Sequence, residues 1–156
     1  MPSLIKELNL SLIKRKITLS VAESCTGGLL SSLLTQISGS SKYFKMAIVA
    51  YSDEAKIRLL RINRNLIKDK GAVSKDIASA MAKAIRKIAK TDLGVSVTGI
   101  AGPTGATERK PVGMVFIAIA DRKYCNYRQF IFRGSRKYIR LQASLAALRL
   151  IKKWIQ

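Results

Sequence analysis

Three short polar segments, rich in glycine and hydroxyl side chains, are where this sequence could carry out chemistry. They are residues 23–28 (Glu-Ser-Cys-Thr-Gly-Gly), 51–56 (Tyr-Ser-Asp-Glu-Ala-Lys) and 98–105 (Thr-Gly-Ile-Ala-Gly-Pro-Thr-Gly). Each segment follows an apolar run that is typical of a buried strand, and open α/β sheets keep their functional sites at strand ends. We therefore expect one site to be assembled from all three.

The first segment places Ser24 where the chain turns from a strand into a helix. Backbone N–H groups at such a turn can hold an oxyanion or a phosphate, which makes Ser24 a candidate nucleophile with Cys25, Thr26, Gly27 and Gly28 as substrate contacts. Cys25 is a rival nucleophile, because thiolates at helix N-termini are activated. Taken alone, this segment fits a plain helix cap, with glycines that serve packing, better than it fits a catalytic turn.

Histidine is absent from the sequence, so a nucleophilic serine would need a different base. Lysine is the usual substitute, and Lys56 in the second segment can act as a base if its amine is neutral. Burial and neighbouring positive charge both lower the pKa of a lysine. Tyr51 could relay a proton or hold the lysine in place. Lys56 also fits an ordinary surface lysine on a helix.

The third segment offers a run of backbone donors and one hydroxyl after a predicted strand. Thr98, Gly99, Ala101 and Gly102 are therefore candidate contacts for a phosphate, a ribose or a carboxamide. Arg136 lies at the predicted start of the last helix, where its guanidinium could pair bidentately with a phosphate. Glycine-rich turns are common, so this segment supports a functional site only together with the other two segments.

Hydrophobic periodicity predicts helices that alternate with strands. Helices are predicted over residues 4–15, 26–37, 53–60, 63–70, 74–90 and 135–155, and strands over residues 17–22, 45–51, 93–98, 112–120 and 124–132. This order, ending in a hairpin, predicts the α/β class and a three-layer α/β/α sandwich around a mixed β-sheet. A chain of 156 residues without a repeat or a linker predicts a single domain over residues 1–156.

The composition bounds the partners of the protein. The 29 lysines and arginines against 9 acidic residues give a net charge of +20, which favours an anionic partner such as a nucleic acid or a phosphate. These cations alternate with apolar residues as on solvated helix faces, which favours a compositional habit without a specific role. A non-catalytic basic binding module for nucleic acid or nucleotides is the alternative interpretation of the function. The scattered acidic residues and the absence of histidine predict neither a metal nor a cofactor.

Apolar runs and cysteines bear on where the protein acts. No run approaches the roughly 18 apolar residues that a membrane span requires, and the first residues lack a signal-peptide core. Two cysteines, Cys25 and Cys125, are too few and too far apart for a disulfide framework. These features predict a cytoplasmic protein that does not associate with a membrane.

Five segments occur here in the order and spacing of one known family. They are residues 22–28, 51–56, 71–74 (Gly-Ala-Val-Ser), 99–103 (Gly-Ile-Ala-Gly-Pro) and 110–113 (Lys-Pro-Val-Gly). From about Leu4 to Trp154 the sequence thus resembles the CinA C-terminal domain family. Stand-alone members of that family, of the PncC type, are nicotinamide-nucleotide amidohydrolases.

The resemblance implies hydrolysis of the carboxamide of nicotinamide mononucleotide to nicotinate mononucleotide and ammonia, a step of pyridine-nucleotide salvage. It implies that Ser24 is the nucleophile and Lys56 the base, with Tyr51 nearby and without a metal. Thr98 and the turn after it resemble the substrate-contacting segment of the family, and Arg136 resembles its basic contact. The implied partner is therefore a small pyridine mononucleotide, and a homo-oligomer is compatible with the sequence.

The sequence departs from the family pattern at a few positions. These are Asp53 for the usual asparagine, Ala106 for a second glycine, Arg109 for an acidic residue, Met114 for a threonine and Ser135 for an acidic residue. Every proposed catalytic group is kept. Because the changes at positions 106, 109 and 135 bear on the predicted pocket, hydrolysis of a different amide is a further interpretation.

Overall fold

The computed structural model describes residues 2–156, and it contains every predicted helix and strand in the predicted order. The elements are α1 (Pro2–Arg15), β1 (Leu19–Glu23), α2 (Leu29–Thr35), the 3-10 helix η1 (Ser40–Lys42), β2 (Phe44–Val49), α3 (Asp53–Leu60), α4 (Arg64–Lys70), α5 (Lys75–Ala89), β3 (Leu93–Gly99), β4 (Met114–Ala120), β5 (Cys125–Ile131) and α6 (Arg136–Trp154). Ser74 and Ser135 accept hydrogen bonds from the first turns of α5 and α6, so both are the N-caps that their positions predict.

Several predicted boundaries shift in the structure, and two of the shifts have a clear local cause. Helix α2 begins at Leu29 rather than at residue 26, because Gly27 and Gly28 have φ angles of 56° and 93°. This left-handed backbone suits glycine and cannot continue a right-handed helix, so residues 24–28 form a separate turn. Strand β4 begins at Met114 rather than at residue 112, because the Met114 N–H bonds back to the Pro111 carbonyl in a tight turn.

The five strands form one mixed sheet in the order β2-β1-β3-β4-β5. Strand β1 pairs in parallel with both β2 and β3, and β4 is antiparallel to β3 and β5. The parallel pairs are connected through helices, whereas β4 and β5 form a hairpin. In its turn, the Asp121 carboxylate accepts hydrogen bonds from the N–H groups of Lys123 and Tyr124, both at 2.7 Å.

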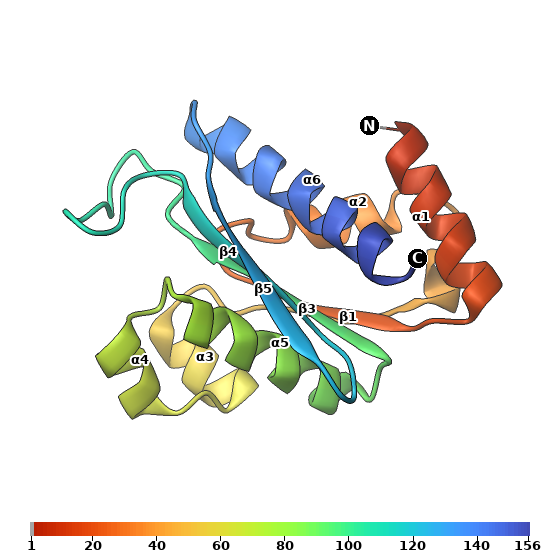
Figure 1. Ribbon diagram of the computed structural model, residues 1–156, viewed down its shortest axis with the longest axis horizontal. Helices are drawn as coiled ribbons and strands as arrows, with labels where there is room; N and C mark the ends of the chain where they lie inside the picture. The colour runs from red at the N-terminus through yellow and green to blue at the C-terminus, as the bar shows by residue number, and fades with distance from the viewer. Residues whose placement is uncertain (1) are drawn as a thin grey trace.

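Helices cover both faces of the sheet, so the predicted three-layer α/β/α sandwich is confirmed (Figure 1). Helices α1, α2 and α6 lie on one face, and α3, α4 and α5 lie on the other (Figure 1). Helix α5 approaches the sheet closely over Gly94, where a Cβ atom would lie 2.1 Å from the Ala82 carbonyl oxygen. None of the helices in the described part of the chain is both long and apolar enough to cross a membrane.

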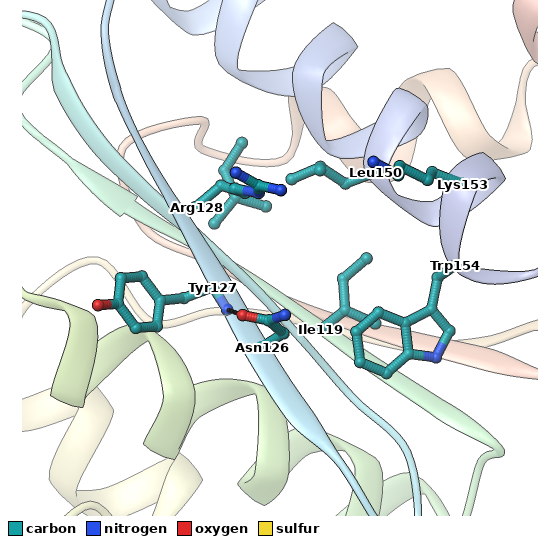
Figure 2. Close-up of a pocket in the computed structure, with 8 residues that line it drawn as sticks. Ile119, Asn126, Tyr127, Arg128, Leu150, Lys153 and Trp154 are labelled. Atoms are coloured by element: carbon teal, nitrogen blue, oxygen red, sulfur yellow. Dashed lines mark hydrogen bonds between the residues drawn. The ribbon is translucent and has the colours of Figure 1, made fainter.

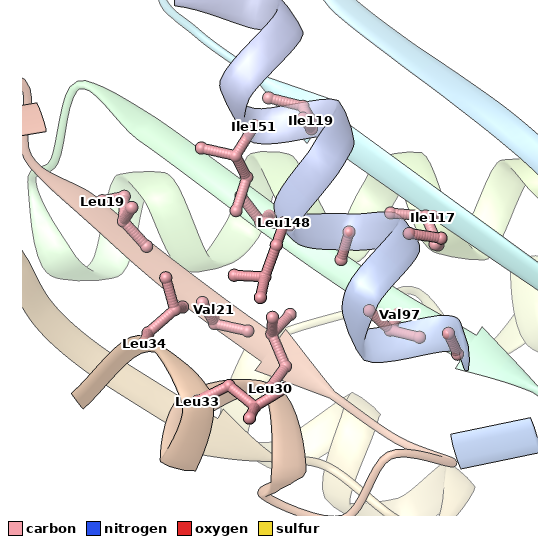
Figure 3. Packing of buried hydrophobic residues seen from close by; sticks show 14 of the residues in the cluster. Leu19, Val21, Leu30, Leu33, Leu34, Val97, Ile117, Ile119, Leu148 and Ile151 are labelled. Atoms are coloured by element: carbon pink, nitrogen blue, oxygen red, sulfur yellow. The ribbon is translucent and has the colours of Figure 1, made fainter. Parts of the chain in front are cut away.

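The larger core lies between the sheet and the layer of α1, α2 and α6. Figure 3 shows branched side chains of β1, β3 and β4 packed against leucines of α2 and against the C-terminal half of α6. These side chains are Leu19, Val21, Val97, Ile117, Ile119, Leu30, Leu33, Leu34, Leu148 and Ile151. Their burial fixes α2 and α6 on the sheet, and Arg136, the first residue of α6, lines the site described next.

The three parallel strands end at one edge of the sheet. Glu23, the last residue of β1, pairs with Val49 of β2 and with Val97 of β3. Beyond it, the Ser24 N–H donates to the Val97 carbonyl at 2.9 Å, and the Ala50 N–H donates to the Glu23 carbonyl at 2.8 Å. The segments that follow these strands therefore begin side by side.

Candidate active site

A pocket of about 220 Å³ lies at the carboxyl ends of β1, β2 and β3. Its lining includes most of the residues that the sequence predicts for the site: Ser24, Cys25, Tyr51, Lys56, Thr98, Gly99, Ala101, Gly102 and Arg136. Asp53, Ala72, Val73, Ile100, Thr104 and Gly105 complete it. Thr26, Gly27 and Gly28 do not line the pocket.

Ser24 and Lys56 face each other inside this pocket. The Lys56 Nζ atom lies 3.3 Å from the Ser24 Oγ atom, and only 1 % of the lysine is exposed. Burial lowers the pKa of Lys56, whereas the carboxylate of Asp53, 3.9 Å from Nζ, acts in the opposite direction. The lysine is therefore not a surface side chain, and its environment favours the neutral amine.

Helix α3 positions this lysine through a well-formed N-terminus. Ser52 is the N-cap, and its hydroxyl accepts a hydrogen bond from the Ala55 N–H at 3.0 Å. The first turn then directs Lys56 back toward the strand ends, where Nζ donates to the carbonyls of Tyr51 at 3.3 Å and Ser52 at 3.5 Å. Two carbonyls and the Ser24 hydroxyl thus fix the amine.

Tyr51 contacts Lys56 through its backbone and Arg136 through its side chain. The ring is 55 % exposed, and its hydroxyl accepts a hydrogen bond from Arg136 Nη2 at 2.6 Å. Arg136 Nη1 donates to the Gly102 carbonyl at 2.9 Å. The guanidinium therefore connects the second and third segments across the mouth of the pocket, and the tyrosine hydroxyl faces it rather than Lys56.

The turn after Ser24 offers fewer free donors than its sequence predicts. The Gly27 N–H donates to the Ser24 carbonyl at 3.0 Å, and the Gly28 N–H donates to the Glu23 carboxylate at 3.0 Å. Within residues 2–156, the N–H groups of Cys25 and Thr26 make no hydrogen bond. The expectation that all four N–H groups are available to a substrate is therefore wrong for Gly27 and Gly28, and of the other two residues only Cys25 lines the pocket.

Cys25 is buried beside Ser24, and this burial lowers the nucleophilicity of its thiol. Only 5 % of the residue is exposed, and burial raises the pKa of its thiol to about 12. At neutral pH the side chain is therefore a protonated thiol, which is a weak nucleophile. The geometry thus favours Ser24 over Cys25 as the nucleophile.

The Thr98 hydroxyl is buried and donates to the Ala72 carbonyl at 2.8 Å. This hydrogen bond connects β3 to the segment before α5.

The departures from the family pattern lie mostly away from the pocket. Ala106 and Arg109 are exposed in the 100–113 loop, which projects from the body of the molecule (Figure 1). Met114 is buried in β4, and Ser135 caps α6. Asp53 is thus the only one of these departures that lines the pocket.

Two residues near the site were not predicted. Glu23 is fully buried and caps the start of α2 with its carboxylate, and Arg140 of α6 binds the Thr26 carbonyl. Glu23 had a local signal, since an acidic residue at the end of an apolar strand needs polar partners. Arg140 had a weaker one, its spacing of one helical turn from Arg136.

A second pocket, of about 230 Å³, lies between β5 and the C-terminal half of α6 (Figure 2). Ile119 and Leu150 give it an apolar floor, Trp154 forms one wall, and Arg128 and Lys153 lie at its rim (Figure 2). Its lining contains no serine, cysteine or carboxylate. Across residues 2–156, no group of three or more potential metal ligands from His, Cys, Asp and Glu lies together.

The fold and the site together define an α/β domain that keeps a polar pocket at the carboxyl ends of its parallel strands. The chain belongs to the CinA C-terminal domain family, whose sequence model matches residues 2–155. Membership confirms the resemblance carried by the five motifs.

Named relatives and solved structures agree. A "CinA-like protein" of Geotalea daltonii is 49 % identical over 136 residues, which cover 87 % of this chain and 33 % of that protein. A "Putative competence-damage inducible protein" of Thermoanaerobacter pseudethanolicus is 44 % identical over 142 residues, covering 91 % and 34 %. The chain thus spans about a third of the length of the curated relatives it matches.

Among solved structures, a competence/damage inducible protein of Agrobacterium tumefaciens superposes with a TM-score of 0.96 at 33 % identity, covering 99 % of this chain and 94 % of that one. A CinA superfamily protein of Klebsiella pneumoniae superposes with a TM-score of 0.95 at 28 % identity, covering 98 % and 96 %. The fold is therefore shared over nearly the whole of these chains.

Proposed function

We propose that this domain hydrolyses the carboxamide of nicotinamide mononucleotide to nicotinate mononucleotide and ammonia, within pyridine-nucleotide salvage. The observation that carries the proposal is the pair of Ser24 and Lys56, a hydroxyl and a desolvated amine 3.3 Å apart in one pocket. A neutral lysine in this position can remove the proton of a serine, which makes the serine able to attack an amide.

The reaction proceeds through an acyl-serine. Lys56 Nζ takes the proton of Ser24 Oγ as this oxygen bonds to the carboxamide carbon, and the carbonyl oxygen becomes an oxyanion. The N–H group of Cys25, which lines the pocket and makes no hydrogen bond within residues 2–156, stabilises the oxyanion at about 3 to 4 kcal/mol. Lys56 returns the proton to the nitrogen as the carbon–nitrogen bond breaks and ammonia leaves. Water then hydrolyses the ester and frees Ser24.

The phosphate of the substrate is assigned to the far side of the pocket. Arg136 is exposed there, and its partners are a neutral hydroxyl and a carbonyl rather than a carboxylate. Its positive charge is therefore available to an anion. The Gly99–Gly105 stretch of the third segment adds backbone groups to the same side of the pocket.

A comparison of substrates tests the proposal. Ammonia release is expected from nicotinamide mononucleotide, with far less from nicotinamide riboside and from nicotinamide, which lack the phosphate. Arg136→Met should raise the KM for the mononucleotide by roughly tenfold or more, which corresponds to about 1.4 kcal/mol, and should change the slow riboside reaction little.

The proposal fails if the wild-type protein releases no ammonia from the mononucleotide, or acts equally on all three amides. Salt-sensitive binding of DNA or RNA in the absence of ammonia release would favour the binding-module interpretation.

Asp53 predicts a shift of the pH profile. Its carboxylate raises the pKa of Lys56, so Asp53→Asn should lower that pKa and leave more neutral lysine at acidic pH. The acid limb of the kcat/KM profile should move to lower pH. Because Asp53 is 59 % exposed, activity on that limb should rise by roughly two- to fivefold only.

Glu54→Gln is the matched control for this measurement, because Glu54 pairs with Arg58 and Arg64 outside the pocket. It should leave the acid limb in place. An acid limb that stays fixed in Asp53→Asn, or moves to higher pH, would contradict Lys56 as the titrating base.

A further inference from the structure

The carboxylate of Glu23 binds the start of α2 and has no exposure to solvent. Its Oε2 atom accepts from the N–H groups of Gly28 at 3.0 Å and Leu30 at 3.2 Å. Its Oε1 atom accepts from the Ser31 N–H at 2.9 Å and from the Ser31 hydroxyl. The protein's own carboxylate therefore occupies the donors of this helix end, and a substrate anion cannot use them.

Arg140 binds the same turn from the opposite side. Its Nε and Nη2 atoms donate to the Thr26 carbonyl at 3.2 and 2.8 Å. The guanidinium also packs on Gly27, where a Cβ atom would lie 3.3 Å from Nη2. Two charged side chains thus bind the turn. The Glu23 carboxylate accepts from N–H groups, and the Arg140 guanidinium donates to a carbonyl.

Glu23 and Arg140 hold this turn from outside. Within the turn, the Gly27 N–H donates to the Ser24 carbonyl and the Leu29 N–H donates to the Thr26 carbonyl. Ser24 is anchored to the sheet through its hydrogen bond with Val97, but residues 25–28 have no strand partner. Gly27 and Gly28, with positive φ angles, add conformational freedom. Without the carboxylate and the guanidinium, the peptide plane that carries the Cys25 N–H group could rotate.

We infer that Glu23 and Arg140 are positioning residues for catalysis, which hold the turn after Ser24 so that the Cys25 N–H group faces the reacting oxygen. This role rests on the proposed amide hydrolysis. Both residues act through the turn, since neither lines the pocket. The Glu23 charge matters because a glutamine would turn an NH2 group toward N–H donors.

Kinetics of Glu23→Gln and Arg140→Met test the inference. In both variants kcat for the mononucleotide should fall by roughly 10- to 100-fold, somewhat less than the loss of one oxyanion donor, with KM little changed. Glu23→Asp keeps the charge and should recover part of kcat. Ser20→Ala is the matched control, because it removes a fully buried polar contact with Thr91 from the other end of β1.

A second readout is independent of the amide substrate. A small fluorophosphonate phosphonylates Ser24: the Oγ–P bond forms as the P–F bond breaks, Lys56 takes the serine proton, and fluoride leaves. Its charged transition state needs the same N–H donor. The labelling rate should fall in Glu23→Gln and Arg140→Met, stay unchanged in Ser20→Ala, and vanish in Ser24→Ala. All rates are measured well below each unfolding midpoint.

The inference is overturned if Glu23→Gln and Arg140→Met lower only the unfolding midpoint, or if Ser20→Ala loses kcat and labelling to the same extent. If Glu23→Gln does not fold, the kcat and the labelling rate of Arg140→Met, at a half-buried position, test the inference alone. A wild-type protein that is labelled at Ser24 but releases no ammonia would refute the proposed substrate, and the labelling rates would still test the positioning role.

Discussion

Lys56→Met is expected to lower the rate of ammonia release by roughly 10³-fold while the domain keeps its fold. The substitution removes the proposed base and fills the same buried space with an unbranched side chain. Because burial penalises the charged amine, the methionine should also leave the unfolding free energy equal or higher. Ammonia assays and thermal unfolding of the same preparation measure both effects.

The pH dependence of the unfolding free energy provides a second test of the Lys56→Met prediction. The pKa of Lys56 is lower in the folded than in the unfolded protein, so between these two pKa values the unfolded chain binds more protons. In that window, the contribution of this lysine to the unfolding free energy rises with pH. Below the folded pKa, the full cost of burying the charge is present. The advantage of Lys56→Met should therefore be largest at low pH and shrink as pH rises.

Lys56→Arg is the matched variant for the role of the base. Its guanidinium cannot lose a proton near neutral pH, so it should be as inactive as Lys56→Met and less stable. Substantial activity in either variant would assign the proton transfer to another group.

Ser24→Ala is expected to release ammonia at a rate lower by roughly 10³-fold or more, whereas Cys25→Ala should remain active. The serine substitution removes the attacking oxygen. The cysteine substitution removes a thiol whose burial raises its pKa to about 12, and it keeps the backbone N–H that the mechanism uses. Steady-state ammonia release from the mononucleotide separates the two variants.

Alkylation provides the control for this pair. Iodoacetamide at neutral pH should modify the half-buried Cys125 of β5 before Cys25, and Cys125→Ala should leave activity unaffected by the reagent. Rapid inactivation through Cys25, together with an active Ser24→Ala, would reverse the assignment of the nucleophile.

The sequence predicts the fold well because its apolar periods are strong. Helix α5 carries a clear apolar face, and the hairpin of β4 and β5 is marked by Asp121. The convergence of the three polar segments was also predictable, since parallel strands end at one edge of a sheet. The mixed sheet and the three layers follow from the same element order.

What the sequence could not supply are contacts made by tertiary structure. A lysine on a helix gives no local sign of burial, and Lys56 is buried only because α3 starts against the ends of β1 and β2. Arg140 meets Thr26 across 114 residues of chain. Glu23 caps α2 from the preceding strand and thereby occupies N–H donors that the local pattern would assign to a substrate.

The C-terminal end of α6 has a practical consequence for anyone who tethers this domain. The Gln156 carbonyl lies 3.4 Å from Arg15 Nη2, and both residues line a surface pocket that also contains Leu93, where β3 begins. The pocket lies beyond the other end of this seven-residue strand, roughly 20 Å away. A biosensor surface or a fused reporter attached at Gln156 should therefore leave the mouth of the pocket open to diffusing nucleotides.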